Sequence, residues 1–142
     1  MVELALVMGI AGLLSALAIP LFMSFYQASR IGSAAQEVVA FLNQGRQLGI
    51  RENTGVCVHI GPAAMQYRLG SSCTGPVWVG PGTDAAGNLA VPAGVALAAT
   101  AHPIFSHLGA ASPGATITLT NLQDGRAVRV SVAVSGRVSI GQ

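Results

Sequence analysis

The first 30 residues constrain the fold most, because they form an apolar segment longer than an ordinary buried helix. Residues 4–23 are almost all apolar, and no charged side chain occurs between Glu3 and Arg30. About 20 apolar residues in an α-helix, at ~1.5 Å per residue, span the ~30 Å hydrocarbon core of a bilayer. The segment lacks the basic residues that precede the apolar run of a secretory signal peptide. We therefore predict a helix that is stored in a membrane or buried by other helices.

Four residues of this segment suggest that the helix has an assembly role. Gly9 and Gly12 form a small face that another helix can approach closely. Pro20 has no backbone N–H and is expected to bend the helix or loosen it locally. The carboxylate of Glu3 lies next to apolar surroundings, where a charge is costly unless it has a partner.

Beyond Arg30 the helix is predicted to continue with an amphipathic pattern. Its apolar residues recur at the spacing of one helix face: Ile31, Ala35, Val38 and Leu42. Asn53 to Gly55 have the composition of a helix C-terminus. The prediction is one long helix, with a transmembrane or filament-core half in residues 1–23 and an amphipathic half in residues 24–54.

From residue 55 onward the pattern changes to short strands separated by turns, which predicts an antiparallel β-rich head over residues 55–142. The expected strands are 56–60, 65–69, 103–105, 115–120, 127–134 and 137–140. Residues 70–94 are rich in Gly, Pro, Ser and Ala, and we expect a long surface loop with one short hairpin, anchored by Trp78. The fold class is therefore α+β, with the amphipathic helix half packed on one small sheet or two.

Two cysteines, Cys57 and Cys73, are placed to join the first strand to the loop after the second. A disulfide is favoured if this part faces an oxidising compartment, and two buried free thiols are the alternative. The three histidines, His59, His102 and His107, do not have the spacing of a metal site. We predict neither a metal nor a cofactor.

The composition also bears on function. The chain has five acidic residues and 8% charged residues, and it contains no P-loop, dinucleotide fingerprint or zinc-protease motif, so we predict that it is not an enzyme. Arg126, Arg129 and Arg137 fall on the last two predicted strands, where they could contact phosphates of a nucleic acid. The favoured alternative is a solvated strand face whose charges protect a sheet edge.

These features together resemble the type IV pilin superfamily. The stretch VELALVMGIAGLLSALAIPLF, with Pro20 seventeen residues after Glu3, is similar to the conserved pilin helix. The helix end around Gly45-Arg46, the stretch from Ile104 to Gly109 and the segment Ser135 to Val138 resemble FimT-like minor pilins and H-type pseudopilins of type II secretion. The resemblance implies a pilin-like fold and a structural subunit of a type IV pilus-like filament or a type II secretion pseudopilus, assembled through its N-terminal helix.

The resemblance also implies partners and a location. The partners are other pilin or pseudopilin subunits in a helical filament, and Glu3 matches the glutamate that neutralises the N-terminal amine of a neighbouring subunit. A prepilin peptidase would cleave and methylate the chain if a leader precedes Met1. The subunit would cross the bacterial inner membrane once, with its head in the periplasm, and then enter the pilus or pseudopilus.

Two alternatives remain open at this point. One is a DNA-binding minor pilin in natural transformation, acting through Arg126, Arg129 and Arg137. The family's C-terminal arginine motif is reduced here to Gly136-Arg137, so the resemblance does not itself imply DNA binding. The other is a single-pass anchored extracytoplasmic domain that does not polymerise.

Overall fold

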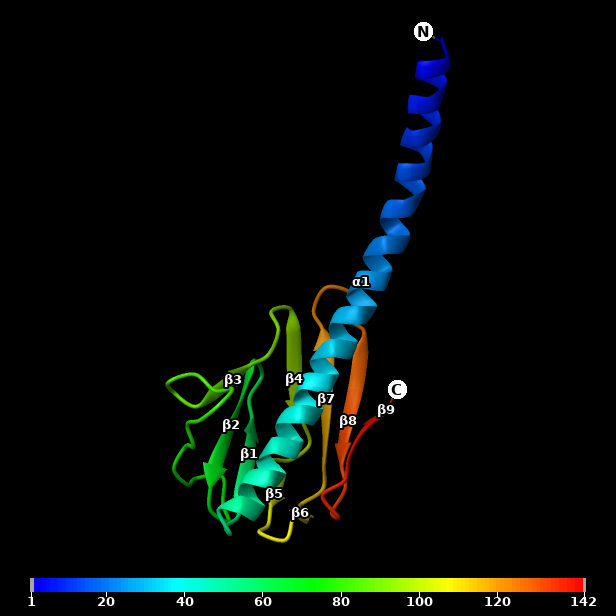
Figure 1. Cartoon of the computed structure of the whole chain (residues 1–142). Coiled ribbons are helices and arrows are strands. Elements are labelled where there is room, and N and C mark those ends of the chain that lie inside the picture. The colour runs from blue at the N-terminus through cyan, green and yellow to red at the C-terminus, as the bar shows by residue number, and fades with distance from the viewer. Residues whose placement is uncertain (1, 142) are drawn as a thin grey trace. The chain divides into compact units, whose positions relative to one another are not determined.

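A computed structural model describes residues 2–141, except for the side chains at positions 17–21 and 24. The chain divides into two compact units, an N-terminal unit of residues 1–30 and a head of residues 31–142. One helix, α1 (Val2–Arg51), contributes to both units, and the remaining elements are strands of the head (Figure 1). The predicted α+β class is confirmed.

The strands of the head form two antiparallel sheets. The first has the order β3-β2-β1-β5-β6 and the second has the order β4-β7-β8-β9. The strands are β1 (Val56–Ile60), β2 (Ala64–Leu69), β3 (Asn88–Ala90), β4 (Val95–Ala99), β5 (Ile104–Phe105), β6 (Ala111–Ser112), β7 (Ala115–Asn121), β8 (Ala127–Val132) and β9 (Val138–Gly141).

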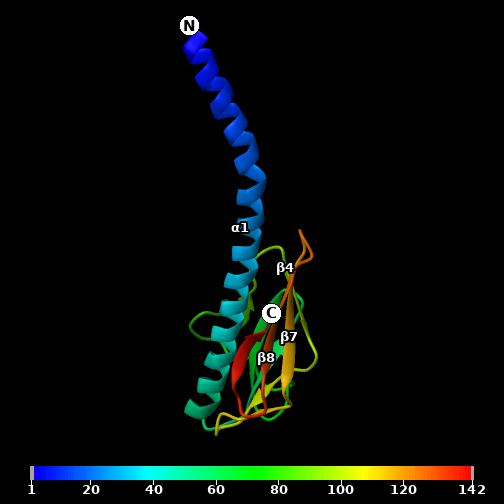
Figure 2. The same cartoon turned by 90° about the vertical axis from the view of Figure 1, so that its right-hand side faces the viewer.

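Within the head, one face of α1 is buried in the core, as its sequence pattern predicts. Ile31, Ala35, Val38 and Leu42 are each at most 4% exposed. They share one apolar cluster with residues from both sheets, among them Val58 of β1, Ile117 of β7 and Val130 of β8. Figure 2 shows this part of α1 lying along one side of the sheets. The helix therefore supplies a wall of the hydrophobic core.

The C-terminus of α1 has the hydrogen bonds of a Schellman motif. The Thr54 N–H donates to the Gly49 carbonyl at 3.1 Å, and the Asn53 N–H donates to the Ile50 carbonyl at 3.3 Å. Asn53 has a φ of 48°, a left-handed conformation that asparagine adopts more readily than most residues. The predicted end of the helix is confirmed, and the cap positions the start of β1.

The β1–β2 hairpin faces α1 through an aromatic contact. The Tyr67 ring stacks on Phe41 of α1 with centroids 4.0 Å apart. A Cβ at Gly45 would lie 2.9 Å from the Tyr67 ring, so a residue without a side chain is required where this ring meets the helix. Trp78 also packs against Tyr67, in an edge-to-face arrangement with ring centroids 5.7 Å apart, and it anchors the loop after β2.

Three strands were not predicted from the sequence: β3, β4 and β6. In β4, Val95 and Leu97 point inward and are 7% and 6% exposed, whereas Ala98 is exposed. Alanine gives this strand little alternation in hydropathy, and the β pattern is therefore weak. β8 also ends two residues earlier than predicted, because the Gly136 N–H donates to the Ala133 carbonyl and starts a turn there.

Candidate functional site

The N-terminal unit presents apolar side chains around its helix. Its large apolar residues among 2–14 and 22–26 are between 51% exposed (Ile10) and 82% exposed (Val2). A helix that is apolar all round is stable only when apolar surroundings cover it. Glu3 lies in the first turn, where a carboxylate also interacts favourably with the helix dipole. The exposed apolar side chains of this unit therefore require an apolar surface to cover them. Glu3 is the acidic residue at the N-terminal end of the unit.

The small face predicted on this helix is open. A Cβ added at Gly9 or Gly12 would meet nothing within 4 Å among the described residues, apart from the backbone of its own helix turn. No contact within the part of the chain that the structure describes accounts for glycine at these two positions. Close approach by another helix remains the predicted reason for them.

Two polar side chains of this unit, those of Ser15 and Arg30, make contacts within the helix. The Ser15 hydroxyl donates to the Ala11 carbonyl at 2.8 Å, so its hydrogen bond stays within the helix. Near the end of the unit, the Arg30 guanidinium lies 6.0 Å from the Tyr26 ring centroid, at the outer limit of a cation–π contact. The apolar run thus ends at an aromatic residue and a cation.

Two predictions for the N-terminal segment involve parts of the chain that the structure does not describe. The side chain of Pro20 is one of these parts, so the helix bend expected at Pro20 stays a prediction. Met1 is the other part, and processing next to it stays a prediction as well. Over the described residues, no helix combines the length and hydropathy that a membrane crossing requires, and the predicted span includes residues 17–21, whose side chains are not described.

The disulfide between Cys57 and Cys73 is present, as predicted. Cys57 is fully buried in β1, and Cys73 lies in the loop that follows β2. The bond closes a loop with a sequence separation of 16 residues. It therefore holds the irregular chain after β2 against the central strand of the first sheet.

The three arginines of the DNA-binding hypothesis do not converge. Arg126 lies just before β8, Arg129 lies within β8, and Arg137 lies in the turn between β8 and β9. This turn follows the pairing of Val132 in β8 with Val138 in β9. At ~3.3 Å per residue, Arg126 and Arg137 are roughly 20 Å apart along the strand. The three arginines are therefore distributed along the whole length of β8, and they do not form a compact phosphate site.

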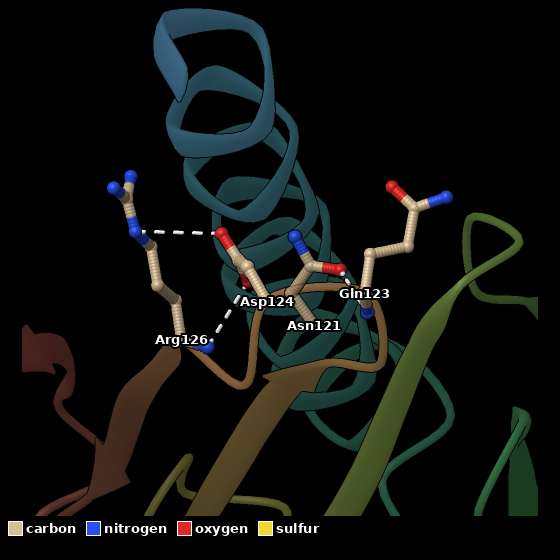
Figure 3. Close-up of polar contacts among 4 residues, drawn as sticks. All are labelled: Asn121, Gln123, Asp124 and Arg126. Atoms are coloured by element: carbon tan, nitrogen blue, oxygen red, sulfur yellow. Dashed lines mark hydrogen bonds and ion pairs between the residues drawn. The ribbon is translucent and has the colours of Figure 1, made fainter. Parts of the chain in front are cut away.

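Arg126 is also engaged by its own turn (Figure 3). Its Nε lies 3.4 Å from the Asp124 carboxylate, and its backbone N–H donates to the same carboxylate at 3.1 Å. The neighbouring Asn121 side chain accepts from the Gln123 N–H at 3.0 Å. The charge of this turn is therefore partly neutralised before any ligand arrives.

His59 and His102 are adjacent, with ring centroids 4.5 Å apart. The Ile60 N–H donates to His102 Nδ1 at 3.2 Å, which places the proton of the neutral ring on Nε2. Neither nitrogen of His102 is then available as a metal ligand. Within residues 2–141, no group of three or more His, Cys, Asp and Glu side chains is arranged to hold a metal ion.

A junction of three chain segments was not recognised from the sequence as a contact. A Cβ at Gly136 would overlap the carbonyl oxygen of Gly109, and a Cβ at Gly109 would lie 2.8 Å from Arg46 Nε. Both glycines have positive φ angles, 79° and 81°. We call Arg46, Gly109 and Gly136 the turn junction, because they join α1 to the β5–β6 and β8–β9 turns.

The turn junction has a sequence signal that could have revealed it. Its members fall in the three separate stretches of the head that resemble minor pilins: Gly45-Arg46, Ile104 to Gly109 and Ser135 to Val138. In the structure, close packing of two glycine backbones against one arginine brings these three stretches together. Arg46 Nε is buried and has no hydrogen-bond partner among the described residues.

The comparisons with known proteins agree with this architecture. The family whose sequence model matches this chain is described as Type II transport protein GspH, and the match covers residues 34–136. No curated protein sequence matches this chain significantly.

Three solved structures have a similar fold. The type IV minor pilin FimU of Pseudomonas aeruginosa has a TM-score of 0.59 and 15% identity, covering 83% of this chain and 92% of its own. The minor pseudopilin EpsH of Vibrio cholerae has a TM-score of 0.60 and 11% identity, covering 79% and 96%. E. coli GspH has a TM-score of 0.62 and 13% identity, covering 80% and 88%. At these identities the likeness concerns the fold.

Proposed function

Because this chain belongs to the family described as Type II transport protein GspH, we propose that it is a minor structural subunit of a pilus-like filament or of a type II secretion pseudopilus. The observation that carries the proposal is the N-terminal unit, whose large apolar side chains are exposed around the helix. A bundle of similar helices would cover that surface. The role is structural and requires no catalytic residue, metal or cofactor.

The helix supplies both the attraction and the register of assembly. Apolar burial draws helices together, and the open faces at Gly9 and Gly12 let two backbones come close. Glu3, in the first turn, is the one acid of the segment. A carboxylate transferred into an apolar bundle requires a cation, and the N-terminal amine of the neighbouring subunit is the proposed partner.

The proposal includes a stage before assembly. The subunit would wait in the bacterial inner membrane with its head in the periplasm, and a prepilin peptidase would process it if a leader precedes Met1. The disulfide of the head is in keeping with an oxidising compartment. Extraction from lipid into the filament would then exchange one apolar environment for another.

The test is the amount of subunit that enters sheared filaments after Glu3→Ala, with the full chain expressed in its host. We expect incorporation to fall by about tenfold or more, since an unpaired amine in the bundle costs more than the ~1.4 kcal/mol that corresponds to tenfold. Glu37→Ala is the matched control, because Glu37 is an exposed acid on the head part of the same helix. Normal incorporation of Glu3→Ala would contradict the proposed pairing.

A further inference from the structure

We propose that the end of the head where α1 finishes binds a different pilin-fold subunit, one that presents an apolar side chain beside a carboxylate. The binding surface is a patch of Ile50, Leu108 and Val134, which we call the end patch. This inference rests on the proposed function, because it assigns the surface through which the subunit contacts a neighbour. It concerns the head alone and does not depend on how the N-terminal helices pack.

The three residues of the end patch come from separate elements that meet at the turn junction. Ile50 lies in the last turn of α1, and its Cδ1 would be 3.2 Å from a Cβ at Gly109. Leu108 precedes Gly109 in the β5–β6 turn. Val134 lies in the β8–β9 turn, two residues before Gly136. Figures 1 and 2 both show these segments together at one end of the head.

The end patch is exposed and apolar. Leu108 is 79% exposed, Val134 is 68% exposed and Ile50 is 49% exposed. Single exposed aliphatic residues are common on soluble proteins, but a group gathered from three elements is typical of an interaction surface.

The end patch is also held by backbone hydrogen bonds. The Gly109 N–H donates to the Ser106 carbonyl at 2.8 Å. The Ala111 N–H donates to the Val134 carbonyl at 3.0 Å, so the two turns are joined directly. A surface that is already ordered loses little conformational entropy on binding. The patch is thus prepared for a partner and needs no folding step.

The charges at this end select the chemistry of the partner. Arg46 lies at the turn junction and Arg137 follows Gly136, and the described residues place neither in an ion pair. The other charges nearby, Arg51 and Glu52, pair with each other at 3.2 Å. The end patch therefore carries unpaired positive charge, and a carboxylate next to the partner's apolar side chain would complement it.

A second copy of this chain fits the end patch poorly. The opposite end of the head has an exposed Leu122, 70% exposed, but the carboxylate beside it, Asp124, is already bound to Arg126. The Asp84 carboxylate accepts hydrogen bonds from its own turn, at 2.8 Å from the Asn88 N–H. Glu37 lines a hollow on the side of α1 together with Phe41 and Leu89, but Phe41 is buried and Leu89 is half-buried, so these apolar neighbours offer a partner little surface. A different subunit is therefore the better occupant.

The first experiment is photo-crosslinking of the full chain in host cells that contain its other filament subunits. A photo-crosslinking amino acid is placed at position 108 or 134, and position 122 serves as the matched control, since its side chain is equally exposed at the opposite end. We expect positions 108 and 134 to crosslink to another pilin-fold chain, at a peptide in which mass spectrometry finds an acidic residue beside an apolar one. We expect position 122 not to crosslink to that peptide.

The second experiment tests the charge. Arg137→Glu is expected to lower the crosslinking yield from position 108 by about tenfold, because it replaces attraction by repulsion. Arg129→Glu, an exposed arginine in the middle of β8, is expected to change the yield less than about twofold. Reversing the charge of the crosslinked acid in the partner should restore the yield with Arg137→Glu. Unchanged denaturation midpoints show that both variants are folded.

Several results would overturn the inference. These are crosslinks from position 108 to another copy of this chain or to no protein, equal crosslinking from position 122, and a yield insensitive to Arg137→Glu. The outcome is separable from that of the proposed function. If Glu3→Ala blocks incorporation while the end patch makes no such crosslink, the filament role stands and only the docking surface is wrong.

Discussion

The Tyr67 hydroxyl donates a hydrogen bond to the Phe41 carbonyl oxygen at 2.6 Å, while the two rings stack face to face. This pair fastens β2 to α1 in the centre of the head. Burial raises the pKa of Tyr67 far above its ordinary value, because the phenolate would lose its hydration. The hydroxyl is therefore a permanent donor, and the contact does not depend on pH in the physiological range.

Tyr67→Phe should lower the free energy of unfolding of the head by about 1–1.5 kcal/mol, the usual net contribution of one hydrogen bond. The ring and its stacking contact remain, so the loss isolates the hydroxyl. The measurement is urea denaturation of the full chain. Tyr26→Phe is the control, because Tyr26 is 58% exposed in the other unit. Equal effects of the two substitutions would contradict a special role for the Tyr67 hydrogen bond.

The turn junction gives a second prediction. Gly136→Ala should destabilise the head by about 3 kcal/mol or more, because the methyl group would overlap the Gly109 carbonyl oxygen and the backbone has a positive φ. Gly125→Ala should cost only about 1 kcal/mol, because Gly125 also has a positive φ but has nothing within 4 Å of its would-be Cβ. Denaturation midpoints of the two variants measure the difference, and similar midpoints would show that the contact is unimportant.

How far the sequence predicts this molecule depends on the range of each interaction. The buried face of α1, its end at Asn53 and the β1–β2 hairpin follow from local spacing, and all were predicted. The disulfide required only that Cys57 and Cys73 be brought together by that hairpin. β4 was missed because its alanines hide the alternation, and its position in the sheet depends on pairing with β7.

Whether a candidate site could be predicted also depends on whether its residues are close together in the sequence. Glu3, Gly9 and Gly12 are visible in the sequence because their surroundings are uniformly apolar, but the partners proposed for them belong to other subunits. The turn junction was not predicted as a contact: Arg46, Gly109 and Gly136 lie in stretches that resemble minor pilins, but only tertiary structure brings the three residues together. The exposure of Leu108 likewise depends on the turn that holds it. The helix therefore follows from the sequence, whereas the surface of the head depends on tertiary contacts.

The histidine pair predicts a loss of stability in acid. Burial, followed by the nearby charges of His102 and Arg68, lowers the pKa of His59 below its ordinary value of 6.5. Between the lowered pKa and 6.5 the unfolded chain binds more protons than the folded chain, so the free energy of unfolding falls as the pH drops through this window.

The measurement for this prediction is the urea midpoint of the full chain at about pH 7.5 and at about pH 5. We expect a lower midpoint at the acidic pH, and a smaller difference in His59→Gln, which removes the titrating group. His107→Gln is the control, because His107 is exposed in the β5–β6 turn. If His59→Gln keeps the full difference between the two pH values, the acid sensitivity originates elsewhere in the chain.

The arrangement of the arginines along β8 predicts weak binding to DNA. Each phosphate contact contributes about 0.9 to the slope of log K against log salt for duplex DNA. Arg126 is paired with Asp124, and Arg129 and Arg137 lie apart along the strand, so we expect a slope of about 1 and no retention at physiological salt. The measurement is retention of labelled duplex DNA by the full chain across a salt series, with Arg129→Ala beside the unaltered chain. Retention at physiological salt that disappears in Arg129→Ala would contradict this prediction and favour a role in DNA uptake.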